Sequence, residues 1–255
     1  MTLHARYPRL AVGLALFGLL ASGCTDNSNP SSSDDTTHKQ ESTQSVNTPA
    51  SQDFDYNSWK PATRVAPVVL DDQALAKARL EWLERNRATI NAGNGAQIEP
   101  PPLVRYLELG ETFEPVAQCI KEAGYDVRLS PDGHGFAYTH QPPDLSTQMW
   151  TCLAQYTPKE VLYPTGADQE SVIYDYYTTF FVPCAEAQGV VFSGEIPSKQ
   201  AWLASLHGDS GTPWHPVTPG STWSTESQHE FDDAKLTALY KACPSSPPAS
   251  ALYGE

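Results

Sequence analysis

Positive charge is scarce in this chain. Sixteen Lys and Arg residues stand against 30 Asp and Glu, so the net charge is -14. Loss of an N-terminal leader containing Arg6 and Arg9 would make it -14 - 2 = -16. Such a surface repels phosphate polyanions and anionic lipid headgroups. Because no basic stripe offsets this repulsion, we expect no nucleic-acid partner.

Motifs with a defined catalytic spacing are missing as well. The sequence contains no P-loop, G-x-G-x-x-G, G-x-S-x-G, H-E-x-x-H or C-x-x-C motif. No His stands at zinc-ligand spacing from a Cys. The sequence therefore favours a non-enzymatic protein with no catalytic residues, no metal site and no cofactor.

Two weaker features keep a hydrolase open as the alternative function. The segment His207-Gly-Asp-Ser210-Gly resembles the G-D-S-G loop of chymotrypsin-like proteases, although Thr212 replaces a glycine of that pattern. Asp132 and His134 lie on one expected hairpin and could form an acid and base pair, but a polar turn also accounts for them. The alternative is a cell-envelope hydrolase that uses Ser210 or the Asp132 and His134 pair.

Only one long apolar run is present, from Leu10 to Leu20, and it is too short to span a bilayer comfortably. Arg6 and Arg9 precede it, and it ends in Leu20-Ala-Ser-Gly-Cys24, which resembles the bacterial lipobox with Ala in place of the usual Leu. We expect residues 1–23 to be a lipoprotein signal peptide and Cys24 to carry lipid, palmitate included. The alternative is ordinary cleavage that leaves Cys24 as a free thiol.

The chain beyond Cys24 divides by composition. Residues 24–55 are rich in Ser, Thr, Asn, Asp and Gln, which predicts a disordered tether of roughly 30 Å average span. Residues 56–110 open the folded region near Tyr56 and Trp59 and contain a helix capped by Asp71 that docks on the core. The basic residues of this helix, which include Lys77 and Arg79, are expected on a solvated face. Residues 103–109 could form a strand or a short helix. Two cysteine units follow at 111–165 and 166–244, and residues 245–255 are expected to be a disordered tail. In the second unit we expect a strand at 190–192, a helix capped by Ser198 and a last helix at about 229–242.

The two units share a pattern. Cys119 and Cys184 each stand five positions before a Gly that ends a helix, and each is followed by one further cysteine, Cys152 or Cys243. We interpret this as a divergent repeat of helix–strand–helix units in a small α+β domain. Four exported cysteines allow three disulfide connectivities. We predict Cys119 with Cys152 and Cys184 with Cys243, because each pair then stays within one unit.

One helix, expected at about 168–187, is dense in aromatic residues. Tyr174, Tyr177 and Phe181 fall on one face at helical spacing and are expected in the core. Two others, Tyr176 and Phe180, lie off that face. Aromatic surfaces with hydroxyl groups often hold peptides or sugars. The predicted binding surface consists of Tyr176, Phe180, Trp214 and Trp223.

The motifs of residues 110–243 resemble those of uncharacterised secreted lipoproteins of Gram-positive actinobacteria. They are Cys119-Ile-Lys-Glu-Ala-Gly-Tyr-Asp-Val127, Cys152, Tyr174-Asp-Tyr-Tyr177, Val182-Pro-Cys184, Gly189, Pro197-Ser198 and Trp214-His-Pro216. The resemblance implies export, membrane anchoring and disulfides, and nothing about a substrate. We therefore expect a lipid-anchored protein on the extracytoplasmic face of the cell membrane, which binds or assists an envelope component or a transporter.

Overall fold

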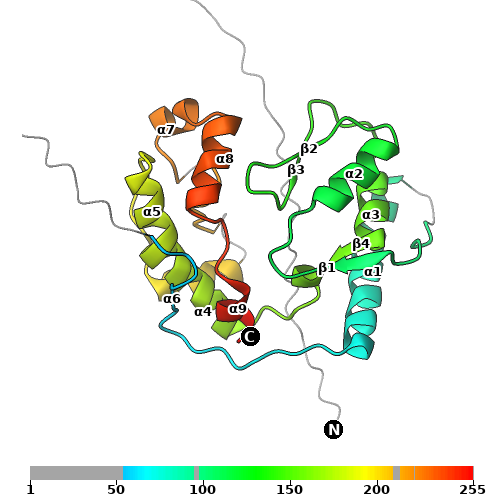
Figure 1. Cartoon of the computed structure of the whole chain (residues 1–255), viewed down its shortest axis with the longest axis horizontal. Coiled ribbons are helices and arrows are strands. Elements are labelled where there is room, and N and C mark those ends of the chain that lie inside the picture. The colour runs from blue at the N-terminus through cyan, green and yellow to red at the C-terminus, as the bar shows by residue number, and fades with distance from the viewer. Residues whose placement is uncertain (1–53, 95–97, 209–212, 221, 255) are drawn as a thin grey trace, which may run out of the picture. The chain divides into compact units, whose positions relative to one another are not determined.

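A computed structural model describes residues 54–94, 98–208, 213–220 and 222–254 (Figure 1). The predicted signal peptide, Cys24 and the tether up to residue 53 lie outside these residues, as does Ser210. The chain divides into Met1–Ser51 and Gln52–Glu255, and the account below concerns the second unit. Its elements are α1 (Asp72–Asn94), β1 (Arg105–Leu107), α2 (Glu114–Glu122), β2 (Arg128–Leu129), β3 (Phe136–Ala137), α3 (Leu145–Gln155), β4 (Tyr156–Pro158), η1 (Lys159–Val161), α4 (Ala167–Tyr176), η2 (Tyr177–Phe181), α5 (Val182–Ala187), α6 (Lys199–Leu206), α7 (Thr225–Glu230), α8 (Asp233–Ala242) and α9 (Ala249–Tyr253).

This described part is mainly helical, with a few short strands and two disulfides, so the α+β expectation holds in its coarse form. Strands β2 and β3 form the predicted antiparallel hairpin, in which Arg128 faces Ala137. For residues 103–109 the sequence left strand or helix open. The structure places strand β1 there, parallel to β4. None of the described helices combines the length and apolar character needed to cross a bilayer.

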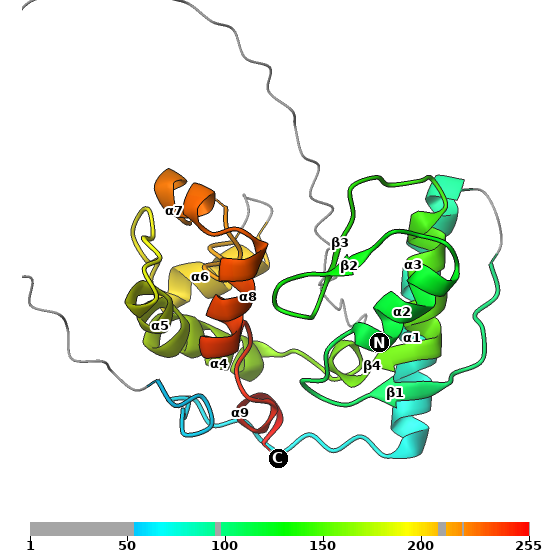
Figure 2. The same ribbon diagram turned by 45° about the horizontal axis from the view of Figure 1, so that its top comes forward.

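Helix α1 begins as predicted, with the Asp71 carboxylate accepting a hydrogen bond from the backbone N–H of Ala74 at 2.8 Å. Leu75 and Leu83 are buried, and α1 lies beside α3, which in turn lies beside α2 (Figure 2). These contacts close a core in the first half of the domain. Its buried members are Leu107, Val116, Ile120, Val127, Leu145, Met149, Cys152 and Leu153.

One basic residue of α1 departs from expectation. The sequence assigned Arg79 to a solvated basic face, yet it is only 9% exposed. Its guanidinium donates to the carbonyl oxygens of Ala154 (2.5 Å) and Pro101 (3.1 Å) and to the hydroxyl of Thr157 (3.2 Å). Burial lowers the pKa of Arg79 below its ordinary value. Arg79 therefore joins α1 to the end of α3 and to the segment before β1.

Both predicted disulfides are confirmed. Cys119 is bonded to Cys152, and Cys184 to Cys243, each with a Cα–Cα distance of 5.8 Å. The helices that carry the first cysteine of each pair also end in the same way.

Gly124 and Gly189 each adopt a φ of 94°, in the left-handed region that glycine tolerates best. The residue after each glycine donates its N–H to the carbonyl five positions back, as in a Schellman cap. The repeated sequence pattern thus encodes a repeated helix stop beside a disulfide.

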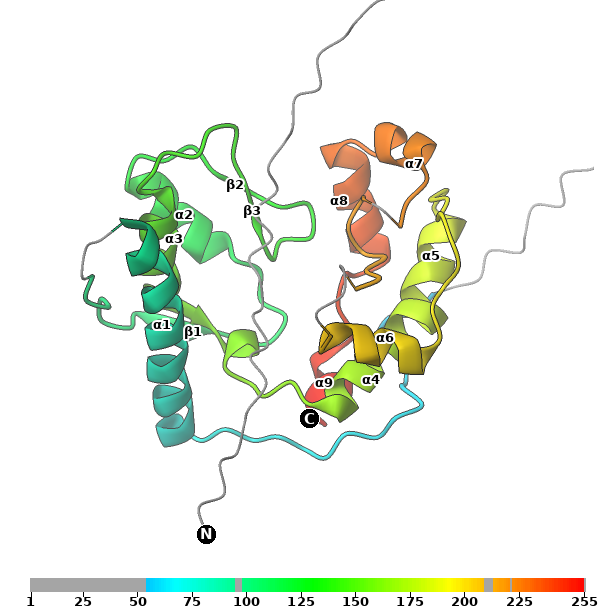
Figure 3. The same cartoon turned by 180° about the vertical axis from the view of Figure 1, so that it is seen from behind.

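Several predicted boundaries were wrong in the second half. Val190–Phe192 is not a strand, since only an isolated bridge joins Phe192 to Trp223. The last predicted helix, 229–242, is two helices, because Asp232 starts α8 by accepting a hydrogen bond from the N–H of Lys235 at 2.9 Å. Helix α4 lies beside α6 and α9 (Figure 3).

The C-terminal segment is also more ordered than predicted. Where a disordered tail was expected at 245–255, residues Ala249–Tyr253 form helix α9. Tyr253 is buried against Tyr163, with ring centroids 4.6 Å apart, and its carbonyl accepts the N–H of Val68 at 2.8 Å. These contacts, together with the packing of α9 against α4, hold a polar, proline-rich segment whose composition predicts disorder.

Candidate functional site

The aromatic helix of the second half is continuous from α4 through a π-helical turn, η2, into α5. A π-helical turn carries more than the usual 3.6 residues and often occurs at functional positions. Four of its aromatic residues are almost fully buried, with exposed fractions of 0 to 7%. They are Tyr176, Tyr177, Phe180 and Phe181.

The predicted binding surface is therefore wrong as an exposed surface. Tyr176, Phe180 and Trp223 are 0%, 3% and 1% exposed, and Trp214 is partly buried. Trp223 packs between Phe192 and Phe231, and its indole N–H donates to the carbonyl of Pro216 at 2.7 Å. Other segments pack against the helix on several sides. Tyr176 and Phe180, which helical periodicity places away from the core face, are therefore buried as well.

On one side the cover consists of α6 and the segment before α7. Tyr174 and Tyr177 contact the rings of Trp202 and Trp214 at centroid distances of 5.6 to 6.5 Å. The hydroxyl of Tyr177 lies 3.1 Å from Nε2 of His215. These contacts bury the face that the sequence assigned to the core.

On another side the cover is the first described segment of the chain, which we call the strap (Phe54–Thr63). It lies on Tyr176 and Phe180, which we call the aromatic ridge. The two ridge rings stack at 5.1 Å with an interplanar angle of 17°. All three strap rings meet them edge-to-face at 5.0 to 6.3 Å: Phe54 on Phe180, Tyr56 on both, and Trp59 on Tyr176.

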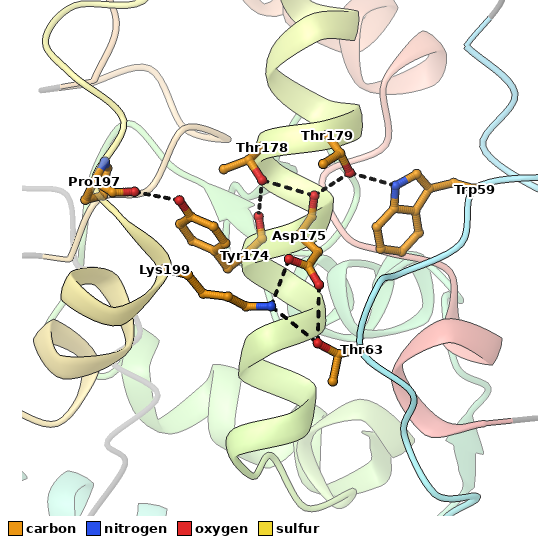
Figure 4. A network of polar contacts seen from close by, with 8 residues as sticks. All are labelled: Trp59, Thr63, Tyr174, Asp175, Thr178, Thr179, Pro197 and Lys199. Atoms are coloured by element: carbon orange, nitrogen blue, oxygen red, sulfur yellow. Dashed lines mark hydrogen bonds and ion pairs between the residues drawn. The ribbon is translucent and has the colours of Figure 1, made fainter.

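Polar contacts fasten the same strap (Figure 4). The indole N–H of Trp59 donates to the hydroxyl of Thr179 at 3.1 Å, and that hydroxyl donates onward to the carbonyl of Asp175 at 2.6 Å. At the far end the hydroxyl of Thr63 donates to the Asp175 carboxylate at 3.3 Å. Lys199 completes the network with a 2.8 Å ion pair to Asp175 and a 3.3 Å bond to Thr63.

The ridge is also held from beneath. The hydroxyl of Tyr176 donates to the carbonyl of Pro244 at 2.6 Å, next to the Cys184–Cys243 disulfide. Burial raises the pKa of Tyr176 and of Tyr177 well above the ordinary 10.0, so both hydroxyls remain protonated. The ridge therefore has one face tied to the disulfide core and the other face under the strap.

The ion pair of this network gives a first test. Because the side chain of Asp175 is 14% exposed and that of Lys199 33%, removing the cation leaves a mostly buried carboxylate with fewer partners. We expect Lys199→Met to lower the free energy of unfolding by about 1 kcal/mol. Urea unfolding measures this change in the free energy of unfolding. Lys235→Met is the matched control, since its pair with Glu230 is half exposed and should change stability by only a few tenths of a kcal/mol. Equal effects in the two variants would contradict the network's role.

The residues that favoured a hydrolase are engaged elsewhere or lie outside the described chain. Asp132 accepts hydrogen bonds from the Ser130 hydroxyl and from the backbone N–H of His134, so it closes a turn. The His134 ring faces Glu160 at 3.9 Å instead. Ser210 belongs to the residues that the structure does not describe. Across the described ranges, no group of three or more His, Cys, Asp or Glu is placed to hold a metal.

A carboxylate–imidazole pair, Glu170 and His207, lies in the second half of the domain without any signal in the sequence pattern. Glu170 in the first turn of α4 is 4% exposed, and its carboxylate lies 3.0 Å from Nε2 of His207. The two residues are 37 positions apart, so periodicity gives no signal for the contact. The imidazole of His207 gives the buried carboxylate of Glu170 a polar partner, and this contact explains the position of His207.

The strap too was missed as a functional element. Phe54 and Asp55 were assigned to the tether, and only Tyr56 and Trp59 marked the start of the folded region. The available signal was three aromatic residues at i, i+2 and i+5 directly after a polar stretch.

Comparison with known proteins adds no further assignment, because no protein-family model, no curated protein and no solved structure matches this chain.

Proposed function

We propose that this protein is a lipid-anchored extracytoplasmic binding or accessory protein of the cell envelope or of a transporter. The observation that carries the proposal is the pair of disulfides, each closed within its own half of the domain. Disulfides persist in oxidising compartments outside the cytoplasm and are rare in mesophilic cytosolic proteins. A domain stabilised in this way fits an exported protein.

The anchor is proposed from the sequence pattern at Cys24. Two or more acyl chains, at about 0.8 kcal/mol for each buried methylene, would hold the protein stably on a bilayer. The strap begins 30 positions after Cys24 (54 - 24). Along the sequence, the proposed anchored segment thus leads directly into the strap.

The contacts of the polar residues that could be catalytic support a binding role rather than an enzymatic one. Asp132 closes a turn through backbone contacts, and Glu170 and His207 satisfy each other. The aromatic ridge and Thr179, by contrast, present two stacked rings and a hydroxyl acceptor to the strap, which turns at residues 56–58. Hydrolysis that is detected and then lost in Ser210→Ala would favour the alternative, an envelope hydrolase.

Anchoring is tested with Cys24→Ser in cells that export the protein. We expect the unaltered chain to incorporate labelled palmitate and to sediment with membranes, and the variant to lose both properties, because serine has no thiol to alkylate. Ser22→Ala, which keeps the cysteine, is the matched control and should stay in the membrane fraction. Lipid-free unaltered protein, or a Cys24→Ser variant that still carries lipid, would refute the proposal.

A further inference from the structure

The strap is attached to the ridge by side chains. Within the described part of the chain, its backbone–backbone hydrogen bonds join only strap residues, from Ser58 to Asp55 and from Trp59 to Tyr56. The next backbone bond to another element is that of Val68 with Tyr253. The strap can therefore leave the ridge without breaking a strand ladder or a helix.

Loss of the strap would leave the ridge largely in place. Tyr176 stays bonded to Pro244, and Phe181 stays stacked near Tyr240 at 6.5 Å, on sides that the strap does not touch. The two ridge rings belong to one continuous helix fixed by the Cys184–Cys243 disulfide. A surface that keeps its shape when uncovered binds a ligand with a smaller ordering cost.

From these observations we infer that the aromatic ridge is a docking site for a peptide segment of a partner protein, and that the strap occupies it as an intramolecular substitute. This inference rests on the proposed binding function and names the class of partner. The strap itself shows the required chemistry: aromatic side chains spaced i, i+2 and i+5, which meet Tyr176 and Phe180 edge-to-face. It also shows one N–H donor for the hydroxyl of Thr179.

A separate partner fits better than a second copy of this chain. The strap of a second copy offers the same contacts as the resident strap and gains nothing by replacing it. The resident strap has an effective concentration on the order of millimolar, as expected for a short connection. A partner peptide with the same aromatic pattern and additional contacts can overcome that advantage, whereas an identical strap cannot do so at ordinary protein concentrations.

The test uses the exported full chain, purified in detergent, and a fluorescent synthetic peptide with the sequence of residues 54–64 as the probe. The double variant Tyr56→Ala/Trp59→Ala weakens the resident strap and leaves the ridge unaltered. We expect the probe to bind this variant saturably, at least about tenfold more tightly than the unaltered chain, because its intramolecular competitor is weakened. Hydrogen exchange should show protection of residues 174–181 when the probe is bound.

Two controls define specificity. The first is a probe with serine at the three aromatic positions, which should not bind. The second is Lys60→Ala in the chain, which alters an exposed strap position and should bind the probe as weakly as the unaltered chain does. If the double variant does not fold, as judged by thermal unfolding, Trp59→Ala alone replaces it, since Tyr56 then still covers the ridge edge.

Three results would overturn the inference: no saturable binding to either strap variant, equal affinity for variant and unaltered chain, or protection outside residues 174–181. A dimer held by exchanged straps, detected by light scattering, would also overturn it, because the occupant would then be a second copy. Failure here is distinguishable from failure of the proposed function. A chain that carries lipid at Cys24 but never binds the probe refutes the docking site alone.

Discussion

Replacement of both Cys184 and Cys243 by alanine is expected to lower the free energy of unfolding by about 4 kcal/mol. The bond closes a loop with a sequence separation of 59, and loop-closure entropy in the unfolded chain gives about that value. Both cysteines are also buried, at 1% and 0% exposure, in the aromatic core of the second half. Removing them adds lost packing to the entropy term, so the measured effect should reach at least this size.

Urea unfolding of the two paired variants measures the effect, with Cys119→Ala/Cys152→Ala as the matched comparison. The first-half bond closes a shorter separation of 33, and Cys119 is only partly buried. We expect its loss to cost somewhat less, although still between about 3 and 4 kcal/mol. A stability unchanged by either double replacement, or free thiols in the unaltered exported protein, would contradict the structure.

Replacement of Arg79 by methionine is expected to lower the free energy of unfolding by about 3 kcal/mol. Methionine fills most of the volume of the arginine side chain. The expected loss of stability therefore comes from polar groups that no longer have a hydrogen-bond donor. The carbonyl oxygens of Ala154 and Pro101 and the hydroxyl of Thr157 all lose a charged donor, and this environment is mostly closed to water. A buried acceptor without a partner carries its full desolvation cost.

Thermal and urea unfolding should be compared with Lys77→Met on the same helix. The side chain of Lys77 is 79% exposed and approaches Glu81 only at 4.0 Å, so this change should stay within about 0.5 kcal/mol. Similar losses for the two variants would mean that Arg79 does not join α1 to α3. Hydrogen exchange that rises in β1 and β4 of Arg79→Met alone would locate the damage at this junction.

The contrast between Arg79 and Lys77 illustrates a limit of sequence reasoning. Both residues fit a solvated basic face of an amphipathic helix. Which of them is buried depends on the carbonyls that end α3, more than 70 positions away in the chain. The same limit applies to Tyr176 and Phe180. Helical periodicity places them away from the core, but it cannot register that the strap, more than 100 positions earlier, covers them.

Local signals in the sequence were sufficient for several features. Asp71 and Ser198 start helices through side-chain caps, and Gly124 and Gly189 end helices in the left-handed conformation. The disulfide pairing also followed from the order of cysteines along the chain, because each bond joins the helices of one unit. These features depend on the chemistry of neighbouring residues, which the sequence states directly.

Only the tertiary structure decided what covers the aromatic helix, how Arg79 is buried, and that the C-terminal segment forms α9. Each of these depends on a contact between residues far apart in the chain, and a single sequence carries no record of such distances. Burial of a ring and hydrogen bonding of a carbonyl stabilise the protein only when folding brings the contacting residue next to them. The sequence thus determined several helix caps and the sulfur crosslinks, while packing determined which of its aromatic residues lie beneath the strap.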